Sequence, residues 1–482
     1  MKKLLTTINL VLISSQAFSF GFNDQAYGSK FEGMNARNLS LGKTSITSDY
    51  SPSSLMKNPA LLGKSSNFKF SVGSYFTGIN ERRAMPIYDS FDSRTIETTV
   101  AKNDDIYYNP YFAMSYGFYL DAIDSKIGLA VGYFPAYSFD YNYTEDIRNN
   151  DPFSLSTRDV IIARATRKME GSIDALSFGF SETFSNISIG ASLALYKIGG
   201  KTKYLERLLD TTGGKNISND QIIAVTDYEI TVTDEISNTP FGLNFGANYD
   251  LNERFSFGAF VQTPVEFKFE NKKLGFKDSA TGLDTTFTIE DLTDITSLQN
   301  ISIGSEYSYK TPLSMGFGTT FKPRNEFNAK VYFDVEMTKW SSINTDTTFT
   351  GESERNIYRS TNLYRTVDED SLIAPVNKFE DTWEFKLGVE YIFENGVPIR
   401  IGFDYSPTYY FEDVIYTNVT LGTGWNFGNL TVDVGMSLGQ IEYTQPHLFT
   451  PTLYYQNPIQ QQETVKVKES LLKTMISATY EF

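Results

Sequence analysis

Residues that could carry out catalysis are scarce in this chain of 482 residues. It contains no cysteine and one histidine, His447, which lies in the stretch QPHLF. Because no serine on a rigid neighbouring element is a plausible partner, His447 does not indicate a hydrolytic triad, and we expect a solvated loop residue. Carboxylates are plentiful, but they lie mainly in expected loops or beside basic residues. We therefore expect no enzyme, no cofactor and no metal site.

Charged residues at alternating positions form the one constellation that suggests a specific role. They occur in three consecutive segments and are Lys330, Asp334, Glu336, Glu384, Lys386, Glu390, Arg400 and Asp404. Side chains on the same face of neighbouring antiparallel strands contact each other laterally, so these residues should build one charged wall. We favour a salt-bridge lattice that stiffens the wall and holds another segment against it. Alternatively, Lys330, Lys386 or Arg400 receives an anionic head group, and arginine would offer a forked contact to a carboxylate.

The elements that position this wall are strands, because a two-residue period recurs along nearly the whole chain. In FKFSVGSYF, for example, apolar residues alternate with polar or small ones. Fourteen segments of this kind can be counted: 68–76, 111–120, 127–134, 174–180, 187–196, 241–249, 255–261, 313–321, 327–337, 383–393, 399–405, 418–427, 430–438 and 472–482.

Short and long connections alternate between these segments. Six connections are short and rich in turn formers, such as Ser185-Asn186 and Gly428-Asn429, whereas the others are long and polar. This arrangement indicates an up-and-down meander whose apolar face looks into lipid and whose polar face lines an interior. A soluble β-sandwich has the same period, but no apolar sequence is left over to pack a second layer.

The final segment, which ends at Phe482, needs a partner strand. An unpaired apolar edge favours aggregation, and a sheet inside a bilayer must close on itself. We therefore expect the last segment to pair with the first. The predicted fold is all-β: a 14-stranded antiparallel transmembrane β-barrel over residues 67–482, with a small N-terminal hatch that contains short helices.

The chain begins with the layout of a secretory signal peptide. Two lysines precede the apolar stretch LLTTINLVLI and the small residues of SSQAFS. This layout predicts a signal peptide over residues 1–19, with cleavage after Ala17 or Ser19. The mature protein should therefore leave the cytoplasm.

Residues 20–66 do not alternate and are predicted to form the hatch, a plug entered from the short-turn side. Within it, Asn58 is expected to cap a single helical turn that begins with Pro59 and Ala60 and stops at Gly63. So short a helix is stable only when it packs against something, and the hollow of the barrel is the available place. A proline-started turn has few internal hydrogen bonds, so we expect Asn58, Pro59 and Ala60 to gate the exit.

This N-terminal segment resembles a known family. The pattern Ala36-Arg37, Leu41-Gly42, Asp49 and Asn58-Pro59-Ala60-x-Leu62 is similar to the hatch of FadL-type transporters of long-chain fatty acids and of TodX-type carriers of aromatic hydrocarbons. Two positions differ from the family pattern. Leu61 replaces the common glycine, and Tyr50 follows Asp49 where the family usually has a second aspartate. The resemblance implies a fourteen-stranded outer-membrane barrel with a hatch. The pattern is also similar to that of PorV-type proteins of type IX secretion.

The expected function is uptake of hydrophobic small molecules across a bacterial outer membrane, with long-chain fatty acids as the favoured cargo. Cargo would diffuse passively through a plugged, monomeric barrel, without nucleotide or metal. The net charge of −16 argues against nucleic acid as a partner. We expect contacts with outer-membrane lipid and lipopolysaccharide, the latter bridged by divalent cations to acidic loops. The alternatives are a secretion partner of the PorV type and a structural or adhesive surface barrel.

Two further sites are expected along the cargo route. Long loops at 197–240 and 262–312 carry apolar residues that should form a capture surface or, alternatively, pack the loops against each other; these are Leu205, Leu208 and Leu209, at helical spacing, and Phe276. Pro135 lacks the amide that a strand ladder needs, and Gly132 lacks side-chain bulk, so pairing should break near the end of the third strand. FadL-type transporters have a kink there through which cargo leaves sideways, and the resemblance implies a lateral gate at Gly132 and Pro135. Alternatively, Pro135 marks the place where the strand becomes a loop above the bilayer.

Overall fold

The computed structural model describes residues 29–32, 34–65, 67–88, 94–148, 160–198, 202–210, 227–278, 283–288, 306–324, 328–343, 346–348, 373–375, 379–409, 414–445 and 465–482. The predicted signal peptide, at residues 1–19, and His447 lie outside the described residues. Within these ranges, no helix has both the length and the apolar character needed to cross a membrane.

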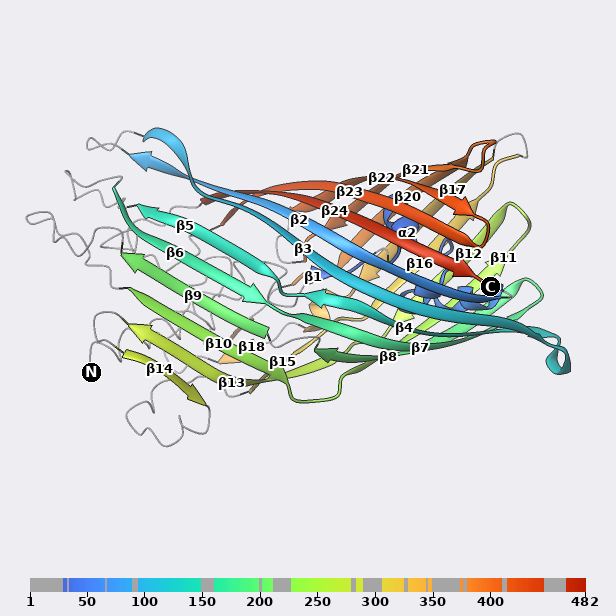
Figure 1. The fold of residues 1–482 in the computed structure, drawn as a ribbon, viewed down its shortest axis with the longest axis horizontal. Coiled ribbons are helices and arrows are strands. Elements are labelled where there is room, and N and C mark those ends of the chain that lie inside the picture. The colour runs from blue at the N-terminus through green and yellow to red at the C-terminus, as the bar shows by residue number, and fades with distance from the viewer. Residues whose placement is uncertain are drawn as a thin grey trace, which may run out of the picture.

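Fourteen antiparallel strands form a closed barrel (Figure 1), as the two-residue period predicts. They are β2 (Phe68–Tyr88), β3 (Arg94–Leu120), β4 (Ser125–Ser138), β7 (Ser172–Phe184), β8 (Ile187–Ile198), β11 (Phe241–Asp250), β12 (Phe255–Gln262), β16 (Ser314–Phe321), β17 (Ala329–Thr338), β20 (Thr382–Ile392), β21 (Pro398–Pro407), β22 (Ile415–Phe427), β23 (Leu430–Gln445) and β24 (Val465–Glu481). Each strand pairs with the next in this order.

The last strand closes the ring by pairing with the first. Sixteen residue pairs join β2 to β24, from Lys69 opposite Glu481 to Ala84 opposite Lys466. The Phe482 amide donates to the Phe68 carbonyl oxygen at 2.9 Å, and the two rings lie 5.2 Å apart. The apolar C-terminal segment therefore has the partner strand that its alternation requires.

The two faces of the sheet have opposite character. In β11, Phe241, Phe245 and Tyr249 point outward and are 40–58% exposed, whereas Asn244 and Asn248 point inward and are buried. The same alternation recurs around the ring, as expected for a wall with lipid outside and a polar interior. The short turns lie at one end, which in an outer-membrane barrel faces the periplasm.

At the long-loop end, additional strands extend the sheet beyond the barrel. They are β5 (Tyr141–Arg148), β6 (Ile161–Glu170), β9 (Thr202–Asp210), β10 (Tyr228–Ile236), β13 (Glu266–Asp278), β14 (Leu283–Thr288) and β15 (Glu306–Lys310). From the sequence, we expected loops in these stretches. In β9 the apolar residues at helical spacing belong to a strand, because β9 pairs along its length with β10 and β6. Smaller elements are η3 (Asp121–Ile123), η5 (Trp340–Ile343) and the pair β18 (Asp346–Thr348) and β19 (Ile373–Pro375).

Residues 29–32 and 34–65, which we call the N-terminal segment, lie inside the ring of strands (Figure 1). Their elements are β1 (Ser29–Lys30), α2 (Ala36–Ser40), η1 (Pro52–Met56) and η2 (Pro59–Lys64). Asn58 caps η2 by accepting from the Ala60 amide, and Pro59 is the first helical residue, as predicted. The turn is 3-10 rather than α-helical and continues through Gly63 to Lys64, so the predicted stop at Gly63 is wrong by one residue.

Candidate functional site

The inner face of the barrel carries glycines at the level of the N-terminal segment. Four pairs oppose each other directly across neighbouring strands: Gly190–Gly246, Gly258–Gly318, Gly388–Gly402 and Gly422–Gly435. A Cβ atom added at Gly190 would lie 2.6 Å from the Ala60 nitrogen, and one added at Gly388 would lie 2.5 Å from the Leu41 oxygen. Backbone of the N-terminal segment therefore occupies the space that side chains would fill. We call these eight glycines the glycine seat.

Gly42 of the N-terminal segment fits this seat with its own backbone. Its φ is 66°, in the left-handed region that glycine adopts without strain. Its amide donates to the Thr420 hydroxyl at 2.8 Å, and that hydroxyl donates to the Ser40 carbonyl oxygen at 3.0 Å. Close approach and backbone hydrogen bonds thus hold the segment against β22.

The residues predicted to form the charged wall lie on β17, β20 and β21. The strand register places its members directly opposite one another in three rows: Lys330, Glu390 and Arg400; Asp334, Lys386 and Asp404; Glu336 and Glu384. Six of these eight side chains are buried inside the lumen, and Lys330 and Glu384 are half-buried.

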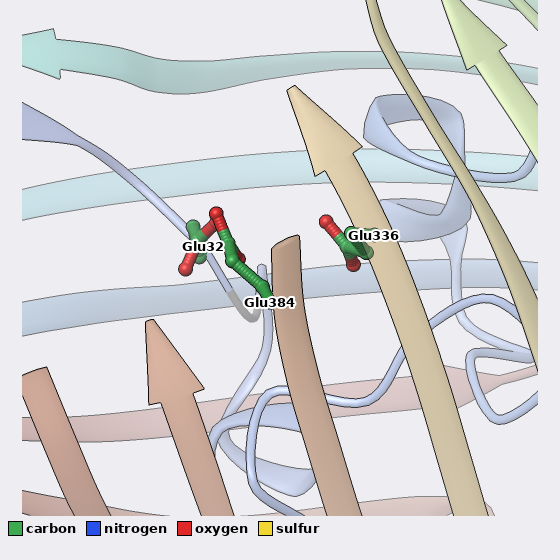
Figure 2. A group of neighbouring side chains, drawn as sticks. All are labelled: Glu32, Glu336 and Glu384. Carbon is green, nitrogen blue, oxygen red and sulfur yellow. The ribbon is translucent and has the colours of Figure 1, made fainter. Parts of the chain in front are cut away.

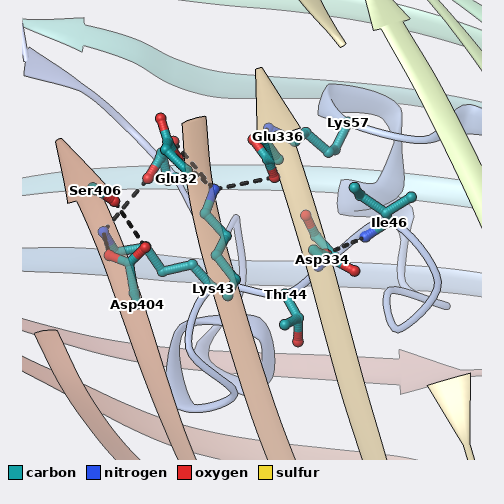
Figure 3. Close-up of polar contacts among 12 residues, drawn as sticks. Glu32, Lys43, Thr44, Ile46, Lys57, Asp334, Glu336, Asp404 and Ser406 are labelled. Atoms are coloured by element: carbon teal, nitrogen blue, oxygen red, sulfur yellow. Dashed lines mark hydrogen bonds and ion pairs between the residues drawn. The ribbon is translucent and has the colours of Figure 1, made fainter. Parts of the chain in front are cut away.

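The wall holds the N-terminal segment through ion pairs and hydrogen bonds (Figure 3). Lys43 pairs with Asp404 at 2.6 Å, and Lys57 pairs with Glu336. Asp334 accepts from the amides of Ser45 and Ile46 at 2.8 and 3.0 Å. These contacts support the interpretation of the wall as a lattice that holds another segment.

Arg37 anchors the segment to the other end of the wall. Its guanidinium binds both carboxylate oxygens of Glu390, at 3.0 and 2.9 Å. Glu390 also accepts from Arg400 at 2.8 Å, and Arg400 reaches Asp433 at 2.7 Å. Arg400 and Lys386 are thus occupied by carboxylates of the protein. Within the described residues Lys330 forms no ion pair, and it lines none of the cavities described below.

Three glutamates from different parts of the chain converge in the lumen (Figure 2): Glu32, Glu336 and Glu384. The Lys386 ammonium lies among them, 3.0 Å from Glu336, 2.9 Å from Glu384 and 3.5 Å from Glu32. Burial raises the pKa of Glu32, but Lys386, Lys43 and Lys57 outweigh burial and hold it well below its usual value. The cluster therefore accommodates a lysine of the protein in the position where a metal ion would bind.

The predicted hatch gate lies against the barrel wall. Asn58 is fully buried, and its amide donates to the carbonyl oxygens of Ile46 at 2.7 Å and Ala247 at 3.2 Å. Pro59 and Ala60 pack onto the glycine pair Gly190–Gly246. The role of this turn as a gate stays a prediction.

Cavities lie on both sides of the N-terminal segment. The upper cavity, of about 270 Å³, opens toward the long-loop end and is lined by Phe31, Ile79, Tyr137 and Leu471 together with Lys30 and other charged groups. A middle cavity of about 30 Å³ adjoins it and lies against the segment. A lower cavity of about 430 Å³ opens at the short-turn end.

At the predicted lateral gate, β4 separates from β3 while it stays paired with β7. Pairing between β3 and β4 ends at Phe112 opposite Tyr133, although β3 continues to Arg94. The register with β7 shifts between Pro135 and Tyr137. A Cβ atom added at Gly132 would clash with the Phe134 ring, so the glycine makes room for a ring that is fully buried.

The inward end of β4 pairs with the N-terminal segment instead of β3. Ser29 and Lys30 in β1 lie opposite Ser138 and Tyr137, and the Phe31 amide donates to the Ala136 oxygen at 3.1 Å. Phe134 and Ala136 belong to a buried apolar cluster that also contains Phe31, Met34, Met56, Tyr111, Tyr196 and Phe267. An apolar region of the lumen thus adjoins the place where β3 and β4 separate.

The predicted capture residues lie on the sheet beyond the barrel. Leu209 is 40% exposed, Leu205 is half-buried, and Leu208 is buried in a cluster with Tyr143. Phe276 lies in β13 opposite Ile230, and its side chain is outside the described part of the structure. Their role in capture stays a prediction.

Sequence similarity identifies the family. The protein-family model described as "Outer membrane protein transport protein (OMPP1/FadL/TodX)" matches residues 10–445 of this sequence. The chain belongs to this family. It is therefore a bacterial outer-membrane transporter of hydrophobic compounds, and membership of a transport family confirms the expectation that it is not an enzyme.

Solved structures of other FadL/TodX-family proteins share the fold. A FadL homologue from Pseudomonas aeruginosa aligns with a TM-score of 0.58 at 14% identity, over 94% of this chain and 100% of its own. The toluene transporter TodX of P. putida aligns with a TM-score of 0.55 at 14% identity, over 94% and 99%. The toluene transporter TbuX of Ralstonia pickettii gives 0.52 at 13% identity, over 94% and 98%. No curated protein matches the sequence significantly.

Several residues of the site were missed in the sequence. Lys43, Lys57 and Glu32 lie outside the alternating segments, so no period marked them as partners of the wall. The glycine seat is visible in the sequence as glycines that recur on the polar face of consecutive strands. Which of these glycines lie opposite each other depends on the register between strands, and single segments do not reveal the register.

Proposed function

We propose that this transporter takes up long-chain fatty acids by passive, ligand-gated diffusion through the plugged barrel. The observation that carries the proposal is the composition of the upper cavity, which combines apolar side chains with an accessible cation. Phe31, Ile79 and Leu471 offer contacts for an acyl chain. Lys30 offers a charge for a carboxylate. A neutral aromatic hydrocarbon would use the apolar side chains alone.

Lys30 is suited to bind a carboxylate because its ammonium is accessible from the cavity. Its ammonium donates to the Gln262 side-chain oxygen at 3.2 Å, and in the described residues it forms no ion pair. It is exposed and lines both the upper and the middle cavity. Lys386 and Arg400 are held by carboxylates of the wall, so they are less suited to the head-group role considered for them.

The proposed route continues from the upper cavity to the lateral gate at Gly132 and Pro135. The buried apolar cluster beside β4 supports this route, since cargo can stay in contact with apolar side chains up to the gap between β3 and β4. Leu205, Leu208, Leu209 and Phe276 are proposed as the first capture surface, and the exposure of Leu209 supports this role. The hatch, residues 20–66, closes the direct path, with Asn58, Pro59 and Ala60 proposed as its gate.

The outward apolar face would contact outer-membrane lipid and lipopolysaccharide. Closure of the ring within one chain supports a monomer, because no strand edge of the barrel needs a partner chain.

The test compares two cargo classes in one variant. Lys30→Gln should weaken binding of palmitate to the purified protein while leaving toluene binding unchanged, because only the fatty acid carries a charge. Lys330→Gln is the matched control, since Lys330 lines none of the three cavities. If palmitate binding is unchanged in Lys30→Gln, or if the wild type binds toluene but no palmitate, the proposed cargo is wrong.

A further inference from the structure

The three cavities form a series along the lumen that is interrupted at one place. The upper and middle cavities share several lining residues, among them Lys30, Glu32 and Lys43. The middle and lower cavities share a single lining residue in the described structure, Asp49. The partition between the two ends of the lumen is therefore thinnest at Asp49.

A dense hydrogen-bond cluster surrounds Asp49. One carboxylate oxygen accepts from the Asn35 amide at 2.9 Å and from the Ser51 hydroxyl at 2.7 Å, and the other accepts from the Ser53 hydroxyl at 2.7 Å. Asn35 also caps α2, and Ser51 caps η1. The cluster thus joins the beginnings of two helices, and Asn35, Asp49 and Ser53 are at least 95% buried.

The middle cavity is lined by both polar and apolar side chains and has room for water. Asn38 lines it, is fully buried, and neither its side-chain oxygen nor its nitrogen has a hydrogen-bond partner in the described structure. Buried amides are nearly always paired with protein or ordered water. The cavity volume corresponds to about two water molecules, which would satisfy this amide. Four lysines also line the cavity, and these are Lys30, Lys43, Lys57 and Lys386.

We propose that the lumen contains a hydrated path along the N-terminal segment, bordered on one side by the apolar cluster beside β4, and that the Asp49 cluster is its seal against small ions. On the long-loop side, ions reach the lysine-lined middle cavity through the upper cavity. On the short-turn side, they reach Asp49 through the lower cavity. The carboxylate and its three side-chain partners fill the space between. This role concerns the permeability barrier and does not depend on the identity of the cargo.

The test is ionic conductance of the purified protein in planar lipid bilayers containing potassium chloride. Asp49→Ala should raise the conductance several-fold over wild type, because it removes the group that separates the middle and lower cavities. Asp49→Asn should keep the wild-type conductance, since the amide has the same shape. Burial raises the pKa of Asp49, although hydrogen bonds from Ser51 and Ser53 lower it, so an uncharged replacement is tolerable.

Glu32→Ala is the matched control, because Glu32 is the other described carboxylate of the N-terminal segment and lines only the upper and middle cavities. It should leave conductance unchanged. Entry of maltotriose into proteoliposomes distinguishes an opened ion path, which excludes this sugar, from loss of the whole N-terminal segment, which admits it. The variant that lacks residues 34–65 is the reference for an open lumen. Wild-type conductance in Asp49→Ala overturns the proposal. So does maltotriose entry in Asp49→Ala, or an increase in conductance in Glu32→Ala as large as that in Asp49→Ala.

Discussion

The glycine seat can be tested by adding a single methyl group. In Gly388→Ala the new Cβ would lie 2.5 Å from the Leu41 oxygen and 2.8 Å from the Leu41 Cβ. An ordinary contact begins near 3.4 Å, so the Leu41 backbone must move away by about 0.9 Å. This movement also disturbs Gly42, the next residue, which packs tightly against Gly402 on the paired strand. Overpacking of this kind costs about 1–3 kcal/mol.

A matched control separates packing from strand propensity. Gly78 in β2 has ordinary space, because the nearest atom to its added Cβ would be 3.8 Å away. Alanine in place of a strand glycine stabilises by about 0.5–1 kcal/mol when it fits. Gly78→Ala should therefore raise the midpoint of thermal unfolding in detergent, whereas Gly388→Ala should lower it and admit small solutes into proteoliposomes. If both variants unfold like wild type and neither leaks, the N-terminal segment is not held by the glycine seat.

Two further predictions concern the gate and the charged cluster. Pro135→Val supplies an amide to the broken pairing of β4 and should slow uptake of labelled palmitate. Pro398→Val, at a short turn, is the control. Equal uptake in both variants would exclude a lateral gate at Pro135. Neighbouring lysines hold the pKa of Glu32 below 4.5 in the folded protein. Ionised Glu32 therefore contributes fully to folding stability above pH 4.5, and this contribution is lost only as the pH falls through the lowered pKa. The midpoint difference between wild type and Glu32→Gln should thus stay constant from about pH 7 to about pH 5 and shrink only in stronger acid, and a difference that already vanishes near pH 6 would contradict the pairing with Lys386.

The sequence predicted the barrel because period, turns and closure are local or topological signals. Alternation assigned a face to residues such as Asp334 and Lys386, and antiparallel neighbours then fixed which of them meet. The strands beyond the barrel were not predicted because they lie in long polar connections, which we interpreted as loops, although some of them alternate, as Tyr141, Tyr143 and Ile147 do in β5. Leu205, Leu208 and Leu209 match a helix face, yet pairing with β6 and β10 determines their structure.

Contacts between the N-terminal segment and the wall could not be predicted, because they depend on a three-dimensional fit. Lys43 and Asp404 are 361 residues apart in the sequence, and no pattern in either stretch relates them. The unpartnered amide of Asn38 and the shared position of Asp49 likewise appear only when the cavities are known.

The separation of β4 from β3 is stable because the N-terminal segment replaces the missing strand. A strand edge freed inside a barrel leaves backbone amides and carbonyls unpaired, and each buried unpaired group costs about 1–3 kcal/mol. Residues 29–31 pair with the freed edge at Ala136, Tyr137 and Ser138. The proposed opening at Gly132 and Pro135 and the seating of the N-terminal segment are therefore energetically linked, since releasing β1 would leave the β4 edge without partners. Cargo bound at Phe31 or Lys30, as proposed, would act on the residues that stabilise the separation of β4 from β3.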